Sequence, residues 1–100
     1  MVKKEENDFN QKQADRKAKV KDLIEMGEFY FINQKWDNAI EVLGKAQKME
    51  PNNPDVYYNL GIVYEMKNYL EEAKHMFEKA LKIKPDHECS KKHLNKLVGT

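Results

Sequence analysis

The chain contains few of the residues that define several protein classes. Its 100 residues include one cysteine, three prolines and four glycines. Because Cys89 is alone, no internal disulfide can form, and stability must come from packing, as is usual in a reducing compartment. Apolar runs are shorter than a bilayer-spanning helix requires, and residues 1–10 are charged where a signal peptide would be apolar. We therefore expect one cytoplasmic domain with no membrane segment.

The charges are distributed unevenly along the chain. The formal net charge is only +1, yet residues 23–78 hold ten acidic and five basic groups, while residues 79–100 hold two acidic and six basic groups. A protein that binds nucleic acid normally presents a concentrated basic face. Since the expected folded body is acidic, we predict no nucleic-acid partner. An acidic body favours a partner with basic side chains, or the basic end of a second copy.

Motifs of catalysis are also missing from the sequence. It has no phosphate-binding loop, no nucleophile spaced suitably from a base and no carboxylate pair in an apolar setting, so we expect no enzymatic activity. Cys89 and His93 are spaced i, i+4 near His87, which could supply three metal ligands. This spacing matches no known zinc pattern, and a buried thiol beside solvent-facing imidazoles explains it better. We therefore predict no cofactor and no bound metal.

An internal repeat is the main positive feature of the sequence. Sliding the chain by 34 residues superposes positions of similar size and polarity. The superposed pairs are Leu23 and Tyr57, Met26 and Leu60, Gly27 and Gly61, Tyr30 and Tyr64, Ala39 and Ala73, Leu43 and Phe77, Ala46 and Ala80, and Pro51 and Pro85. Within each unit the apolar residues recur at i, i+3, i+4 and i+7, which is the spacing of one helix face. Each unit therefore predicts a hairpin of two helices.

Punctuating residues predict where the helices begin and end. Asn68, followed by Glu71 three residues later, has the pattern of a capping box at the start of a helix. Asn53 can cap the following helix, with Pro54 in its first turn. The prolines that end each unit cannot continue the preceding helices. The hairpins are therefore expected to be joined by short turns.

Small residues predict close packing between the paired helices. A glycine that faces two alanines allows two helices to approach closely, and aromatic residues such as Tyr64 and Phe77 can fill the space around that contact.

These residues resemble the tetratricopeptide repeat (TPR) family, whose 34-residue pattern is matched closely by residues 54–87. Residues 20–53 match more loosely, with Met26 and Leu43 at substituted positions, and Gln34 and Asn68 stand where a turn glycine is usual. The resemblance implies an all-α fold, a right-handed superhelix of two helical hairpins with a C-terminal capping helix. Trp36 could anchor a partner, but it lies at the turn where similar proteins have an aromatic residue packed against the hairpin, so the resemblance implies a core position for it.

The resemblance also implies a division of the chain into four segments. These are a charged N-terminal segment, helical or partly disordered, at 1–19, repeats at 20–53 and 54–87, and the capping helix at 88–100. In the cap, Leu94, Leu97 and Val98 are expected to face inward. Residues 9–19 offer only a thin apolar stripe, so a frayed or partner-dependent helix is expected there.

Similar proteins use the first helix of each hairpin to line a concave groove that receives a peptide. By that resemblance the candidate peptide-binding residues are Ile24, Glu28, Phe31, Tyr58, Asn59, Ile62, Glu65 and Lys92. The implied function is protein–protein interaction, as an adaptor, a scaffold or a co-chaperone-like module. Alternatively, these residues are covered by the capping helix, by the N-terminal segment or by another copy in a homo-oligomer.

Some TPR proteins bind the acidic C-terminal tails of heat-shock chaperones through a clamp of Lys, Asn and Arg residues. Here Asn59 and Lys92 match the clamp, whereas Ile24, Glu28 and Cys89 occupy its other three positions. An apolar and an acidic residue would fail to pair with a carboxylate. The resemblance therefore favours a partner segment that is apolar or basic.

Overall fold

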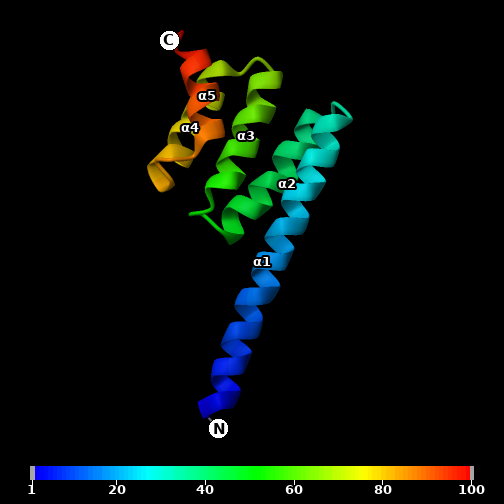
Figure 1. Cartoon of the computed structure of the whole chain (residues 1–100). Coiled ribbons are helices and arrows are strands. Elements are labelled where there is room, and N and C mark those ends of the chain that lie inside the picture. The colour runs from blue at the N-terminus through cyan, green and yellow to red at the C-terminus, as the bar shows by residue number, and fades with distance from the viewer. Residues whose placement is uncertain (1, 100) are drawn as a thin grey trace.

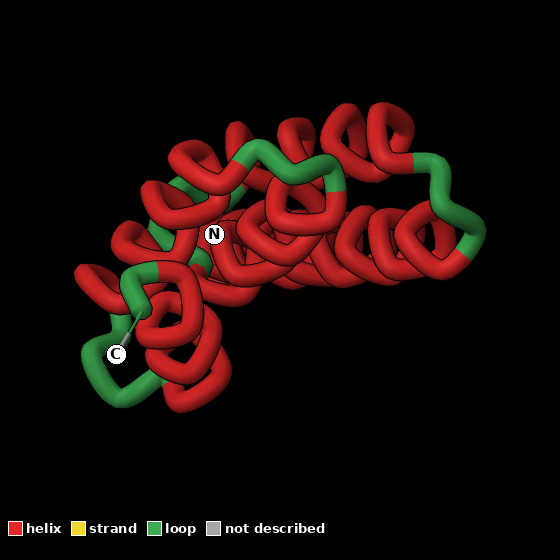
Figure 2. Tube along the Cα trace, turned by 90° about the horizontal axis from the view of Figure 1, so that it is seen from above, coloured by secondary structure: helices red, strands yellow, loops and turns green. Residues whose placement is uncertain are grey.

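The computed structural model describes the backbone of residues 2–99 and the side chains of residues 9–99. The described residues form five helices and no strand, which confirms the all-α prediction. The helices are α1 (Val2–Ile32), α2 (Trp36–Met49), α3 (Pro54–Met66), α4 (Leu70–Ile83) and α5 (Glu88–Leu97). Viewed from above, the helices are joined at their ends by short loops (Figure 2).

The helices stack as two hairpins closed by a fifth helix. α1 packs on α2 and α3 on α4, while α2 contacts α3 and α4 contacts α5. The chain measures 57 × 29 × 16 Å, and its long axis follows α1, which extends well beyond the other helices (Figure 1). The side chains of residues 9–19 on this extension are all exposed, and Val20 is the first buried side chain. The extension therefore adds length without adding to the core.

The core is built around small residues, as predicted. The four repeated alanines, at positions 39, 46, 73 and 80, are fully buried. Each repeated glycine lies under a large side chain of the paired helix. A Cβ atom built on Gly27 would lie 2.8 Å from Cγ of Leu43, and one built on Gly61 would lie 2.6 Å from Cε1 of Phe77. The alanines thus let the helices approach, while the glycines provide room for Leu43 and Phe77.

One of the two predicted helix starts is confirmed and the other is wrong. The Oδ1 atom of Asn53 accepts a hydrogen bond from the backbone N–H of Asp55 at 2.9 Å, and Pro54 is the first residue of α3. Asn68 instead belongs to the preceding turn, with a φ of 65°, and α4 follows Tyr69, which makes no side-chain cap. A capping box between Asn68 and Glu71 is therefore not formed.

The two hairpin turns share a backbone conformation that usually favours glycine. Gln34 has a φ of 60° and Asn68 has a φ of 65°, both in the left-handed region. The next residue in each turn donates its N–H back to the first helix, from Lys35 to Tyr30 at 2.8 Å and from Tyr69 to Tyr64 at 2.9 Å. The repeat therefore keeps the same turn in both units without glycine.

The predictions for Trp36 and for the last helix are confirmed in part. Trp36 is half-buried against the core, with its ring 5.4 Å from that of Phe31. In α5, Leu94 and Leu97 are half-buried, but Val98 follows the end of the helix and is 46% exposed. The inward-facing role expected of Val98 is therefore wrong, because the helix stops one residue too early to turn it inward.

Candidate functional site

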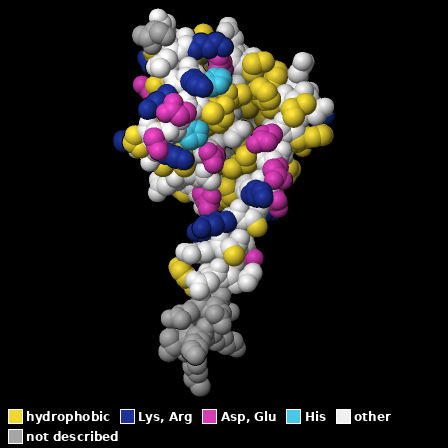
Figure 3. Space-filling view, in the orientation of Figure 1, with side chains coloured by type: hydrophobic (Ala, Val, Ile, Leu, Met, Phe, Trp, Pro, Cys, Tyr) yellow, Lys and Arg dark blue, Asp and Glu magenta, His cyan; other side chains and the backbone are white. Residues whose placement is uncertain are grey.

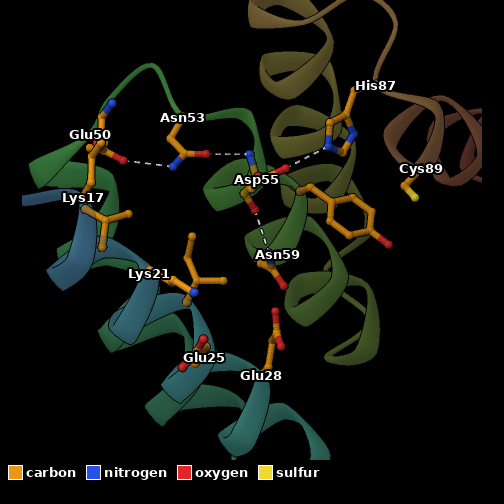
Figure 4. Close-up of a pocket in the computed structure, with 13 residues that line it drawn as sticks. Lys17, Lys21, Glu25, Glu28, Glu50, Asn53, Asp55, Asn59, His87 and Cys89 are labelled. Carbon is orange, nitrogen blue, oxygen red and sulfur yellow. Dashed lines mark hydrogen bonds and ion pairs between the residues drawn. The ribbon is translucent and has the colours of Figure 1, made fainter. Parts of the chain in front are cut away.

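The largest cavity lies between the first helices of the two hairpins and the start of α5. Its volume is about 730 Å³. Figure 4 shows the residues that surround it, with α1 on one side and α3 on the other. The lining residues are Lys17, Val20, Lys21, Ile24, Glu25, Glu28, Glu50, Asn53, Asp55, Tyr58, Asn59, His87 and Cys89.

A smaller cavity of about 250 Å³ continues the first one along the same two helices. It is lined by Gly27, Glu28, Phe31, Ile32, Leu43, Tyr58, Asn59, Ile62 and Val63. Glu28, Tyr58 and Asn59 line both cavities, so the two form one continuous depression, which we call the groove. Figure 3 shows hydrophobic side chains gathered in a hollow of the body, with acidic side chains on both sides of it.

The structure brings six of the eight predicted binding residues together in the groove. Ile24, Glu28, Phe31, Tyr58, Asn59 and Ile62 all line one or both of its cavities. Glu65 and Lys92 line neither. The carboxylate of Glu65 lies 3.1 Å from Nδ1 of His93 and 3.9 Å from Nζ of Lys96, so it joins α3 to α5. Lys92 is exposed on α5.

Tyr58 lies at the centre of the groove, where its position is fixed by aromatic neighbours. Its ring centroid is 5.3 Å from that of His87, 5.7 Å from that of His93 and 6.1 Å from that of Phe77. Burial raises the pKa of the Tyr58 phenol, and the charge and hydrogen bond of the nearby Cys89 side chain raise it further. The phenol is therefore neutral at physiological pH and presents a polar edge to the groove.

The histidines and the cysteine of α5 are arranged in the opposite way to the prediction. Cys89 is exposed, whereas His87 and His93 are half-buried. Nδ1 of His87 accepts the backbone N–H of Ser90 at 3.3 Å, so Nε2 carries the proton and donates to Asp55 at 3.1 Å. α5 packs against α4, and the two imidazoles reach the carboxylates of Asp55 and Glu65 on α3, so they join α3 to the last helix instead of facing solvent. Among residues 9–99, no three His, Cys, Asp or Glu side chains are grouped suitably for a metal ion.

Sequence reasoning missed several charged residues of the groove. Lys21 and Glu25 precede the predicted Glu28 by seven and three positions on α1, so they share a face with it. This spacing was a sufficient signal to find them. Asp55 and His87 could not be found in the same way, because their approach depends on how the last helix is placed after α4.

The carboxylates of the groove differ in what they contact. Asp55 accepts from His87, and Oε1 of Glu50 accepts from Nδ2 of Asn53 at 3.0 Å. Glu25 and Glu28 form no ion pair or hydrogen bond with the side chains described, residues 9–99. The groove therefore combines apolar walls with two carboxylates on α1 that are not neutralised by a direct partner.

Comparison with known proteins extends the resemblance. The chain is 31% identical over 64 residues to mouse (Mus musculus) sperm-associated antigen 1, a match that covers 64% of this chain and 7% of that protein. A MamA mutant has a similar solved structure, with a TM-score of 0.69 and 26% identity, covering 80% of this chain and 58% of that one. The first TPR of Spaghetti (RPAP3), bound to an HSP90 peptide, is 22% identical with a TM-score of 0.44, covering 82% of this chain and 92% of that one. The chain thus spans a small part of the curated relative and just over half of the MamA chain.

Family models identify the repeats directly. One model, described as TPR repeat, matches residues 27–68, and a second, described as Tetratricopeptide repeat, matches residues 54–87. No helix among the described residues combines the length and apolar character needed to cross a membrane. With two helical hairpins, matching repeat models and a similar solved repeat structure, the chain belongs to the tetratricopeptide repeat family.

Proposed function

We propose that the chain is a cytoplasmic adaptor or scaffold module, without enzymatic activity, that binds an apolar or basic peptide segment of another protein in the groove. TPR domains are protein-interaction folds, which supports the general function. In this proposal residues 20–53 and 54–87 act as the two repeats, residues 88–100 cap them, and residues 1–19 extend the first helix.

The observation that carries the proposal is that Tyr58 and Ile62 remain half-exposed at the centre of the groove. Among the side chains of residues 9–99, the N-terminal extension and α5 contribute only Lys17 and Cys89 to the lining of these cavities. An apolar surface that is hollow and open offers a partner both buried area and shape. The unneutralised Glu25 and Glu28 beside it disfavour an acidic tail and favour a basic segment.

The groove can be tested by selecting random linear peptides on the full chain and measuring their affinity for a Tyr58→Ala, Ile62→Ala double variant. Removing two central side chains from an interface commonly costs more than about 2 kcal/mol, which corresponds to at least a thirtyfold weaker affinity. We expect the selected peptides to lose binding by that amount, measured by fluorescence polarisation. Circular dichroism and thermal melting of the variant would establish that the helices remain folded.

A control is available on the second helix of the second hairpin. Leu70, the first residue of α4, is 46% exposed and lines neither cavity of the groove. Leu70→Ala is expected to leave the affinity of the same peptides unchanged. Peptides that bind the folded double variant as tightly as the native chain would place their site outside the groove and contradict the proposal.

A second candidate function, self-assembly, is favoured by one specific surface. On the outer side of α1, Met26 is 44% exposed and Phe29 is 62% exposed. With Asp22, Glu25 and Tyr30 they line a shallow cavity, so this apolar surface has an acidic edge. The exposed lysines of α5 in a second copy, Lys91, Lys92 and Lys96, have the complementary charge.

Molar mass measured by light scattering tests self-assembly. If the outer side of α1 joins two copies, the native chain is expected to show a concentration-dependent mass above that of the monomer, and Phe29→Ala should shift it towards the monomer. The Phe29 ring contacts only its neighbour Tyr30 among the aromatic rings described, so its removal should leave the fold intact. A native chain that stays monomeric at high concentration would exclude this candidate.

A further inference from the structure

Two hydrogen-bond acceptors face one another across the groove at the point where its two cavities meet. Glu28 on α1 and Asn59 on α3 line both cavities. In Figure 4 the side chains of these two residues point toward one another. The amide of Asn59 is held in place, because its Nδ2 donates to the backbone carbonyl of Asp55 at 2.8 Å. Its Oδ1 is therefore left as the atom presented to Glu28.

The carboxylate of Glu28 and Oδ1 of Asn59 are both hydrogen-bond acceptors, so neither can donate a hydrogen bond to the other. The nearest cations on the same helix face, Lys21 and Lys17, lie towards the N-terminal end of the groove, and neither forms an ion pair with Glu28. Asp55 on α3 and Glu50 at the end of α2 add negative charge to the lining, and Asp55 is already bonded to His87. The electrostatic environment around this pair of acceptors is therefore suited to a cation with several N–H donors.

The smaller cavity begins directly beside these acceptors and is apolar. Its floor is formed by Gly27, Leu43 and Val63, and its walls by Phe31 and Ile62. The side chain of Leu43 occupies the space above Gly27, so the missing side chain of the glycine lets Leu43 form part of this floor. A volume of about 250 Å³ is enough for one aliphatic side chain with room for its backbone, and too small for a folded element. The two helices that line the groove run in the same direction along it, from Ile24 to Phe31 on α1 and from Tyr58 to Ile62 on α3.

We infer that the groove selects a segment in which an arginine or lysine stands beside an aliphatic residue. The basic side chain sits between the carboxylate of Glu28 and Oδ1 of Asn59, and the aliphatic side chain enters the cavity beside Phe31 and Ile62. This inference rests on the proposed function and adds the chemistry of the ligand. Arginine fits best, since its planar guanidinium can donate to both acceptors at once.

The experiment uses the full chain and four synthetic peptides that differ only at the centre of a Gly-Ser sequence. The central pairs are Arg-Leu, Ala-Leu, Glu-Leu and Arg-Ala, and fluorescence polarisation measures their affinities. Arg-Leu is expected to bind about tenfold more tightly than Ala-Leu or Arg-Ala, with Glu-Leu the weakest, since a charged hydrogen bond at a partly exposed site is worth about that factor. The preference for arginine should decrease as salt is added.

Glu28→Gln tests the role of the carboxylate, because it keeps the size and an acceptor oxygen while removing the charge. This variant is expected to bind Arg-Leu about fivefold to tenfold more weakly and to bind Ala-Leu unchanged. Glu41→Gln is the matched control, since Glu41 is exposed on α2 and lines neither cavity of the groove. Glu28→Lys should reverse the order and prefer Glu-Leu.

The outcomes separate this inference from the proposed function. Equal affinities for Arg-Leu and Ala-Leu, with both lost in the Tyr58→Ala, Ile62→Ala variant, would leave the groove as the binding site and overturn its selection of a basic residue. If Glu41→Gln weakens Arg-Leu as much as Glu28→Gln does, the effect reflects overall charge and the inference is also overturned. Peptide binding that survives the double variant would contradict the proposed function as well.

Discussion

Phe77→Ala is expected to destabilise the fold by about 3 to 5 kcal/mol, the usual cost of removing a fully buried phenylalanine. Phe77 is completely buried. Its ring stacks on His93 with centroids 5.3 Å apart and lies over Gly61, so it contacts α3 and α5 from α4. A loss of this size is a large fraction of the stability of a small domain. Urea denaturation followed by circular dichroism would measure it.

The control for this prediction is the same substitution at an exposed site. Phe29→Ala removes the same atoms from a side chain that is 62% exposed, so its effect on unfolding is expected to stay within about 0.5 kcal/mol. Because both substitutions remove the same atoms, the difference between their unfolding free energies measures the effect of burial. A Phe77→Ala protein with the same unfolding free energy as Phe29→Ala would mean that the core is not organised around this ring.

Substituting alanine for glycine is expected to have opposite effects at two helical positions. At Gly61 the new Cβ would lie 2.6 to 2.9 Å from three atoms of the Phe77 ring. This ring cannot move aside easily, because it is stacked on His93 and near Tyr58. We expect Gly61→Ala to destabilise the protein by about 1 to 3 kcal/mol, as overpacking usually does.

Gly44 provides the matched comparison in α2. A Cβ atom built there meets nothing within 4 Å, so the substitution adds no clash. Alanine is favoured over glycine inside a helix by up to about 1 kcal/mol. Gly44→Ala is therefore expected to raise the free energy of unfolding by up to about 1 kcal/mol. Thermal denaturation of both variants beside the native chain would measure the two shifts. Shifts of the same sign would show that the space above Gly61 is not filled as described.

Much of the fold could be predicted because the repeat encodes it locally. The 34-residue period, the spacing of apolar residues and the cap formed by Asn53 all depend on residues close in sequence. Asn68 was placed wrongly because its side chain suits both a helix cap and a left-handed turn, and the turn geometry takes precedence here. The turn of the first repeat shows the same preference, since Gln34 adopts that conformation too.

The site could be predicted only where helix periodicity defines it. The groove residues on α1 and α3 follow from a second stripe on each helix, rotated by one residue from the buried stripe. In contrast, the partners of Glu65 and His87 depend on the angle at which α5 docks, and no local pattern encodes that angle. Lys92 was expected in the groove because it matches the clamp of similar proteins, but it is exposed on α5 and lines neither cavity.

The contact between Tyr58 and Phe77 has a consequence for changing what this module recognises. Tyr58 faces the groove, yet it also lies against a ring that the core requires, so a smaller residue at this position would remove a contact with Phe77 as well as a contact with the partner. Glu28, Phe31 and Ile62 have no comparable packing role against Phe77. Retargeting the module would therefore begin with those three positions, and the tyrosine would be kept as a constant part of the recognition surface.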